Sequence, residues 1–97
     1  MFDYTGQLVQ ATAGRDKGEL FCIVGMDQEQ DRLLLANGKR RKVFRPKAKK
    51  LGHVKMLTVS GREYDHPAIQ KLKQGEPVSD RELRRALAAF KEGFKLG

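Results

Sequence analysis

Glycine recurs at short intervals through the first part of this chain and limits what that part can fold into. Glycine readily adopts the positive φ that tight turns require, and it weakens the interior of a helix or strand. The intervening segments are short and rich in apolar residues, which is typical of β-strands. We therefore predict a β-rich unit over residues 1–60, with its glycines at positions 6, 14, 18, 25, 38, 52 and 61 marking turns or boundaries.

Five strands are predicted in this unit. Residues 20–26 carry apolar side chains in both alternating sets of positions, so both faces should be buried, as in a central strand. Residues 14–18 are expected to form a tight turn in which one or both flanking glycines have positive φ. The predicted strands cover residues 8–13, 20–26, 32–36, 39–44 and 53–59.

Two local features predict how the third and fourth strands are connected. Asn37-Gly38 lies between two candidate strands, and this dipeptide favours a type I′ hairpin turn with residues 39–44 as the return strand. Pro46 lacks a backbone donor and pushes the preceding residue toward an extended conformation. We therefore expect residues 45–52 to form a connection rich in basic residues and not a strand.

After Gly61 the sequence predicts two helices that form a C-terminal extension, residues 61–97. Residues 67–73 suit a short helix with proline in its first turn. Residues 79–82, Ser-Asp-Arg-Glu, match a capping box and predict a second helix of about four turns. Its apolar stripe, which we expect to pack on the β-rich unit, consists of Leu83, Leu87, Phe90 and Phe94.

Positive charge is concentrated in the β-rich unit. The chain has 20 Lys and Arg against 12 Asp and Glu, a formal net charge of +8. Residues 1–60 hold twelve basic and six acidic residues, a net of +6, whereas residues 61–97 hold eight and six, a net of +2. Residues 39–55 include nine basic residues and no acidic one. Such an excess indicates a polyanionic partner.

The side chains suited to catalysis or metal binding are few. Asp65-His66 suggests a general base or a metal ligand, but no nucleophile or second ligand lies at a recognisable spacing. We expect Asp65 to act at a helix N-terminus instead. Cys22 is the only cysteine and is expected to be a small buried hydrophobic residue. The sequence thus predicts a protein that is not an enzyme and has no cofactor and no metal site.

The sequence also predicts a cytoplasmic protein. No apolar run is long enough to cross a bilayer. Residues 1–6 have neither the basic region nor the apolar stretch of a secretory signal. A monomer is the default expectation.

The segment from Gly6 to Glu19 combines alternating apolar positions, Ala13-Gly14, and Lys17-Gly18 leading into an apolar strand. This pattern resembles the KOW motif of large-subunit ribosomal proteins and NusG-type elongation factors. With the later basic residues, the resemblance extends over residues 6–58 to small bacterial ribosomal-protein-like KOW proteins that bind RNA. It implies a small SH3-like β-barrel of about five strands with RNA at its loops and strand edges. The resemblance does not extend to the two predicted C-terminal helices, which together with the barrel would make an α+β protein.

The leading functional hypothesis is a non-enzymatic RNA-binding protein that docks on ribosomal RNA or ribosomal particles through a basic face. Lysine and arginine neutralise phosphates, and arginine can also stack on bases or hold phosphate through two hydrogen bonds. Phe44, among these residues, is expected either to fill the core or to stack on a base. The predicted RNA-contacting residues are Arg15, Lys17, Lys39, Arg40, Arg41, Lys42, Arg45, Lys47, Lys49, Lys50, His53 and Lys55.

The alternative is a protein-interaction module of the transcription or translation machinery. In this hypothesis a ribosomal or transcription-machinery protein binds the apolar stripe of the C-terminal helix, and the basic residues only steer the encounter. Charge by itself does not distinguish RNA from DNA. The two hypotheses differ in which substitutions abolish partner binding, those in the basic segment or those in the helix.

Overall fold

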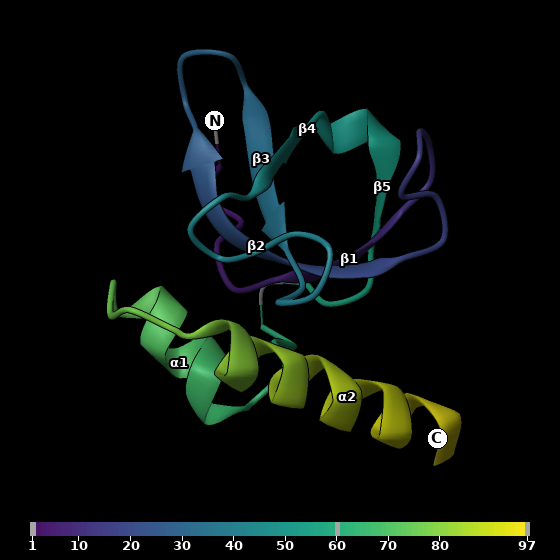
Figure 1. Cartoon of the computed structure of the whole chain (residues 1–97), viewed down its shortest axis with the longest axis vertical. Helices are drawn as coiled ribbons and strands as arrows, with labels where there is room; N and C mark the ends of the chain where they lie inside the picture. The colour runs from purple at the N-terminus through teal and green to yellow at the C-terminus, as the bar shows by residue number, and fades with distance from the viewer. Residues whose placement is uncertain (1, 60, 97) are drawn as a thin grey trace.

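The computed structural model describes residues 2–59 and 61–96, with side chains described as far as Gly93 (Figure 1). It consists of a five-stranded antiparallel sheet and two helices, which confirms the predicted α+β class. The elements are β1 (Leu8–Ala11), β2 (Leu20–Asp27), β3 (Arg32–Ala36), β4 (Lys47–Lys49), the 3-10 helix η1 (Leu51–His53), β5 (Val54–Met56), α1 (Pro67–Lys73) and α2 (Asp80–Leu96).

The sheet has the order β4-β3-β2-β1-β5, so β2 is central, as predicted. The sheet curves strongly, and its two edge strands, β4 and β5, are connected through η1 (Figure 1). Between residues 2 and 59, no ladder of hydrogen bonds joins β4 to β5, so the sheet is open there. A register shift between Ile23 and Gly25 interrupts the pairing of β2 with β3. Such an irregularity bends a strand and increases its twist.

Each face of the sheet has its own hydrophobic cluster, because successive side chains of a strand point to opposite faces. The inner cluster lies on the concave face, and its buried residues all come from strands: Val9, Ala11, Phe21, Ile23, Leu33 and Leu35. The outer cluster lies between the sheet and the two helices. It includes Leu8, Cys22, Ala36, Ile69, Leu83 and Leu87.

The helices begin where the sequence predicts, but one cap differs. The Ser79 hydroxyl oxygen accepts a hydrogen bond from the Glu82 amide at 3.1 Å, as expected for the capping box. At α1 the capping side chain is His66, whose Nδ1 accepts from the Ala68 amide at 3.1 Å. Asp65 instead accepts from the side-chain amide of Gln70 at 3.2 Å. Asp65 thus lies at the N-terminus of α1, as expected, but His66 makes the capping hydrogen bond.

Three of the four residues in the predicted apolar stripe of α2 pack against the β-rich unit. Leu83 and Leu87 are buried, and the partly buried Phe90 packs against the same cluster. Phe90 also meets Tyr64 edge to face, with ring centroids 5.2 Å apart. The side chain of Phe94 lies outside the described part of the chain.

The predicted hairpin at Asn37-Gly38 is wrong. Residues 39–44 form turns and bends, and the fourth strand is Lys47–Lys49, inside the segment that was expected to be a loop. The Asn37 side-chain oxygen accepts from the amides of Lys39 and Arg41 at 3.0 and 3.1 Å. These bonds fold the backbone back on itself directly after β3 and prevent a two-residue hairpin.

The connection from β3 to β4, residues 37–46, is here called the basic loop. It docks on α2: Arg84 donates to the Gly38 carbonyl oxygen at 2.8 Å, and the Val43 amide donates to the Asp80 carboxylate at 2.8 Å. These long-range contacts favour an irregular loop over a strand. Pro46 ends the loop and precedes β4, an edge strand, where a missing backbone donor costs little.

Candidate nucleic-acid interface

The turn between β1 and β2, residues 14–18, has the predicted glycine conformations. Gly14 and Gly18 have φ of 81° and 90°. Backbone bonds close the turn, from the Lys17 amide to the Gly14 carbonyl at 3.2 Å and from the Gly18 amide to the Ala11 carbonyl at 2.8 Å. This geometry leaves Arg15 and Lys17 exposed and buries the side chain of Asp16.

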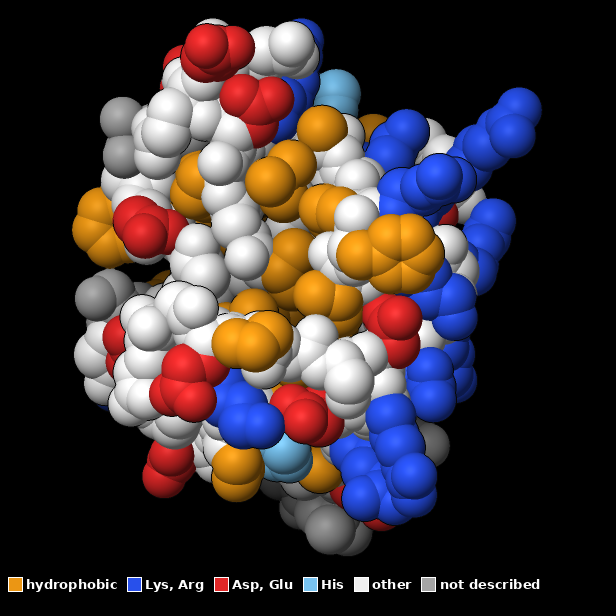
Figure 2. Space-filling view, turned by 60° about the vertical axis from the view of Figure 1, so that its left-hand side comes forward, with side chains coloured by type: hydrophobic (Ala, Val, Ile, Leu, Met, Phe, Trp, Pro, Cys, Tyr) orange, Lys and Arg blue, Asp and Glu red, His pale blue; other side chains and the backbone are white. Residues whose placement is uncertain are grey.

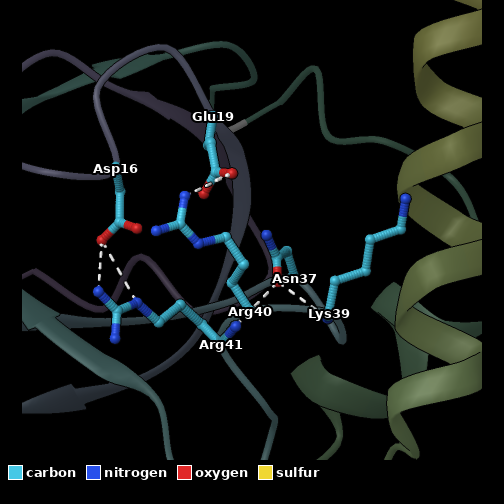
Figure 3. Close-up of polar contacts among 6 residues, drawn as sticks. All are labelled: Asp16, Glu19, Asn37, Lys39, Arg40 and Arg41. Carbon is cyan, nitrogen blue, oxygen red and sulfur yellow. Dashed lines mark hydrogen bonds and ion pairs between the residues drawn. The ribbon is translucent and has the colours of Figure 1, made fainter.

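Two ion pairs join this turn region to the basic loop (Figure 3). The Arg41 guanidinium donates to one Asp16 carboxylate oxygen from Nη2 at 2.9 Å and from Nε at 3.3 Å. Arg40 pairs with Glu19 at 3.4 Å in a more exposed setting. Lys39 points the other way, toward α2 (Figure 3). The two segments are more than twenty residues apart, so only the fold brings these charges together.

Asp16 has an unusual electrostatic environment. Burial by itself raises the pKa of Asp16, but the hydrogen bond and charge of Arg41, with the charges of Lys49 and Arg40, outweigh it. The pKa of this carboxyl therefore lies below its usual value, and Asp16 is ionised at neutral pH. Its negative charge holds Arg41 in place, and the Arg41 side chain stays 29% exposed.

A hollow of about 450 Å³ opens beside this pair. The turn, the start of β3, β4 and η1 contribute to its walls, and we call it the basic hollow. In the described part of the chain its only carboxylate is Asp16, which is already paired with Arg41. The basic and imidazole side chains that line it are Arg15, Arg32, Arg41, Lys47, Lys49, Lys50 and His53.

Six of the twelve predicted RNA-contacting residues thus line the basic hollow. The other six are Lys17, Lys39, Arg40, Lys42, Arg45 and Lys55, all exposed and outside its lining. Lys49 is 8% exposed, and its ammonium lies so close to the turn that a Cβ on Gly14 would be 3.2 Å from it. The predicted set is therefore divided into six residues that line the hollow and six exposed residues that do not.

Sequence reasoning missed Arg32. This residue begins β3, and its guanidinium donates to the Gln30 carbonyl oxygen at 2.7 Å. Pairing of Leu33 with Lys49 brings the start of β3 to the wall of the basic hollow. Since Lys49 was assigned to a loop, that register was not available from the sequence.

The surface charge is uneven as well. In Figure 2, Lys and Arg side chains gather along the right-hand side of the molecule, whereas Asp and Glu predominate toward the left. Phe44 is 79% exposed, so the expectation that it fills the core is wrong. Phe44 is therefore an exposed aromatic side chain within a strongly basic segment of the sequence.

The side chains that the sequence singles out for chemistry outside the basic segment are Cys22 and the Asp65-His66 pair. Cys22 is fully buried, and burial raises the pKa of its thiol to about 12, so the prediction of a buried hydrophobic residue is confirmed. Within the described residues, no three His, Cys, Asp or Glu side chains are grouped so that they could hold a metal ion. No helix in the same part of the chain has the length and apolar character needed to cross a membrane.

In comparisons with known proteins, no family model matches this chain, and no curated protein is significantly similar to it. The resemblance of residues 6–58 to KOW proteins stays a prediction for this reason. The case for a function depends on the basic hollow and its surroundings.

Proposed function

We propose that this protein is a non-enzymatic RNA-binding protein that holds the backbone of structured RNA in its basic hollow, with ribosomal RNA or a ribosomal particle as the target. The observation that carries the proposal is the composition of the hollow. Six Lys and Arg side chains and His53 surround a space whose single described carboxylate is paired with Arg41. In this proposal the curved sheet is an SH3-like barrel of the KOW type.

Physical chemistry supports phosphate as the ligand group of the hollow. A concave surface lined by one sign of charge focuses the potential and raises the local concentration of the opposite charge. Neutralised phosphates release counterions, which favours binding at low salt. Asp16 fixes Arg41 in advance, so less side-chain freedom is lost when the guanidinium meets a phosphate.

The packing of α2 supports this hypothesis over the protein-interaction alternative. Leu83 and Leu87 are buried against the sheet, so a partner could reach that stripe only by displacing the core. The exposed surface of α2 carries charged residues such as Arg81 and Arg85. The apolar stripe is therefore used within the chain itself.

The proposal is tested by sedimenting the tagged protein with ribosomal particles across a salt series and sequencing the crosslinked RNA. The test variant carries Arg15→Glu, Lys47→Glu and Lys50→Glu in the hollow. The control carries Arg81→Glu, Arg85→Glu and Lys91→Glu on α2, across the sheet from β4 and η1 (Figure 1). Each variant changes the formal net charge from +8 to +2, because 8 minus three changes of 2 is 2. All six side chains are exposed.

We expect the wild type and the control to stay on one particle above physiological salt with crosslinks at one RNA site, and the hollow variant to dissociate. If six to eight phosphates are bound, log K should fall with log salt with a slope of roughly −4 to −7. Equal losses in the two variants would indicate attraction by net charge alone. Retention of the hollow variant would refute the proposal.

A further inference from the structure

Phe44 is the most exposed large hydrophobic side chain in the described part of the protein, at 79%. Its ring packs in neither hydrophobic cluster. An aromatic side chain that stays in water adds little to the stability of the fold, because its apolar surface is not removed from solvent. Packing within the protein therefore does not explain why an aromatic side chain occupies this position.

The backbone that presents the ring is fixed by other contacts. The Arg45 amide donates to the Lys42 carbonyl at 3.0 Å and closes the turn around Phe44. On one side, the Val43 amide is bound to the Asp80 carboxylate, and the Val43 side chain packs against the outer cluster. On the other side, Pro46 restricts the chain. The exposed ring is thus held in a defined place by contacts that do not involve it.

Several cationic residues lie close to Phe44 in the sequence. Lys42 and Arg45 are exposed on either side of it in the sequence, and Lys47, three residues on, lines the basic hollow. Three residues span at most roughly 11 Å of extended chain. A nucleic-acid strand whose phosphates lie in the hollow can therefore reach the ring.

We propose that Phe44 stacks on an unpaired base of the RNA strand whose backbone lies in the basic hollow. This inference rests on the proposed function and narrows it: the preferred ligand is RNA with an unpaired nucleotide, as in a loop or bulge. A base inside a continuous duplex has no free face, whereas a splayed base stacks readily on an aromatic ring. Every base has such a face, so the contact selects RNA shape more than RNA sequence.

The experiment compares binding to an RNA duplex and to the same duplex with a short single-stranded bulge, so that effects at the duplex ends cancel. The variants are Phe44→Ala and Phe44→Leu, which keeps apolar volume without the ring. The matched control is Phe2→Ala, because Phe2 is also exposed, at 59%, and lines a different hollow that contains Asp3 and Glu63. Thermal melts verify that each variant is folded.

We expect Phe44→Ala and Phe44→Leu to weaken binding to the bulged RNA by roughly 5- to 150-fold. Binding to the continuous duplex should be unchanged, and the salt slope should be the same because the ring carries no charge. The chain has no tryptophan, so Phe44→Trp introduces a single tryptophan as a fluorescent reporter. Its emission should be quenched by the bulged RNA and unaffected by the duplex.

The outcomes separate this inference from the proposed function. If the wild type binds neither RNA, the proposed function fails and the stacking inference fails with it. If the wild type binds both RNAs and Phe44→Ala behaves like Phe2→Ala, only the stacking inference is refuted. Loss of binding to ribosomal particles with RNA affinity unchanged would assign the ring to a protein contact and would also refute it.

Discussion

The turn at residues 14–18 and the basic loop at residues 37–46 both connect strands, but different contacts hold each of them in place. Each connects two neighbouring strands, each contains glycine with positive φ, and each contributes basic side chains to one region. The turn is closed by its own backbone hydrogen bonds. The basic loop also has internal hydrogen bonds, but it is in addition docked on a distant element through Asp80 and Arg84 of α2.

The geometry of the candidate binding site therefore depends on both local and long-range contacts. The turn is a local structure that the sheet needs in order to pair β1 with β2. The shape of the basic loop depends on a helix that begins more than thirty residues later in the chain. Because the Asp16–Arg41 pair joins the two segments, the basic hollow is stabilised both by the local hydrogen bonds of the turn and by the contacts of the basic loop with α2.

The largest effect is expected from Arg41→Ala, which removes the link between the turn and the basic loop. Asp16 is 1% exposed, and it would lose the partner that compensates its buried charge. We expect the free energy of unfolding at neutral pH to fall by about 3–5 kcal/mol, as measured by chemical denaturation. The comparison variant is Arg40→Ala, whose pair with Glu19 is exposed and worth no more than about 1 kcal/mol. Equal effects of the two substitutions would contradict this account.

The next prediction contrasts the glycines of the two segments. Gly38→Ala places a methyl group against the backbone oxygen of Asp80 at a φ of 78°, whereas Gly18→Ala at a φ of 90° meets no atom within 4 Å. We expect Gly18→Ala to lower the free energy of unfolding by about 1 kcal/mol because of backbone strain. Gly38→Ala should cost about 2–4 kcal/mol, since strain and overlap combine. Thermal or urea denaturation measures both, and a smaller loss for Gly38→Ala than for Gly18→Ala would show that the loop can leave α2 freely.

A smaller effect is expected at Asp80, which contacts the basic loop but not the turn. Asp80→Ala removes the acceptor of the Val43 amide and an acidic group from the first turn of α2. We expect a loss of about 1–2 kcal/mol. Asp80→Asn retains an acceptor oxygen and should recover most of that loss. Faster hydrogen exchange at Val43 in the alanine variant alone would locate the effect in the loop.

The smallest effect is expected in the pH dependence of stability, through the ionisation of Asp16. Since the pKa of Asp16 is held below its usual value by Arg41 despite burial, its ionised form stabilises the fold. This contribution is present above the usual aspartate pKa, about 3.9, and is lost as the pH falls through the lower pKa of the folded state. We expect the stability difference between the wild type and Asp16→Asn to narrow as the pH is lowered through that range. A constant difference, in denaturation curves recorded at each pH, would show that the Asp16 charge has no part in it.

Prediction from the sequence was accurate where local interactions decide the structure. The positive φ of Gly14 and Gly18, the central place of β2 and the Ser79 cap all follow from nearby residues. It was wrong for residues 39–44, because the Asn37-Gly38 signal for a hairpin is weaker than the contacts of the loop with α2. The missed Arg32 and the exposed Phe44 have the same cause, since both depend on where β4 and the basic loop lie.

The α+β class, the order of the main strands and helices, and the concentration of basic residues before position 60 can be read from the amino-acid sequence. These follow from periodicity, turn residues and charge, which act over a few positions of the chain. Three other features are set by the folded structure: which basic residues surround the hollow, the pairing of Arg41 with Asp16, and the exposure of Phe44. Those outcomes depend on packing between segments far apart in sequence, where a hydrogen bond to α2 or a buried carboxylate outweighs local propensity.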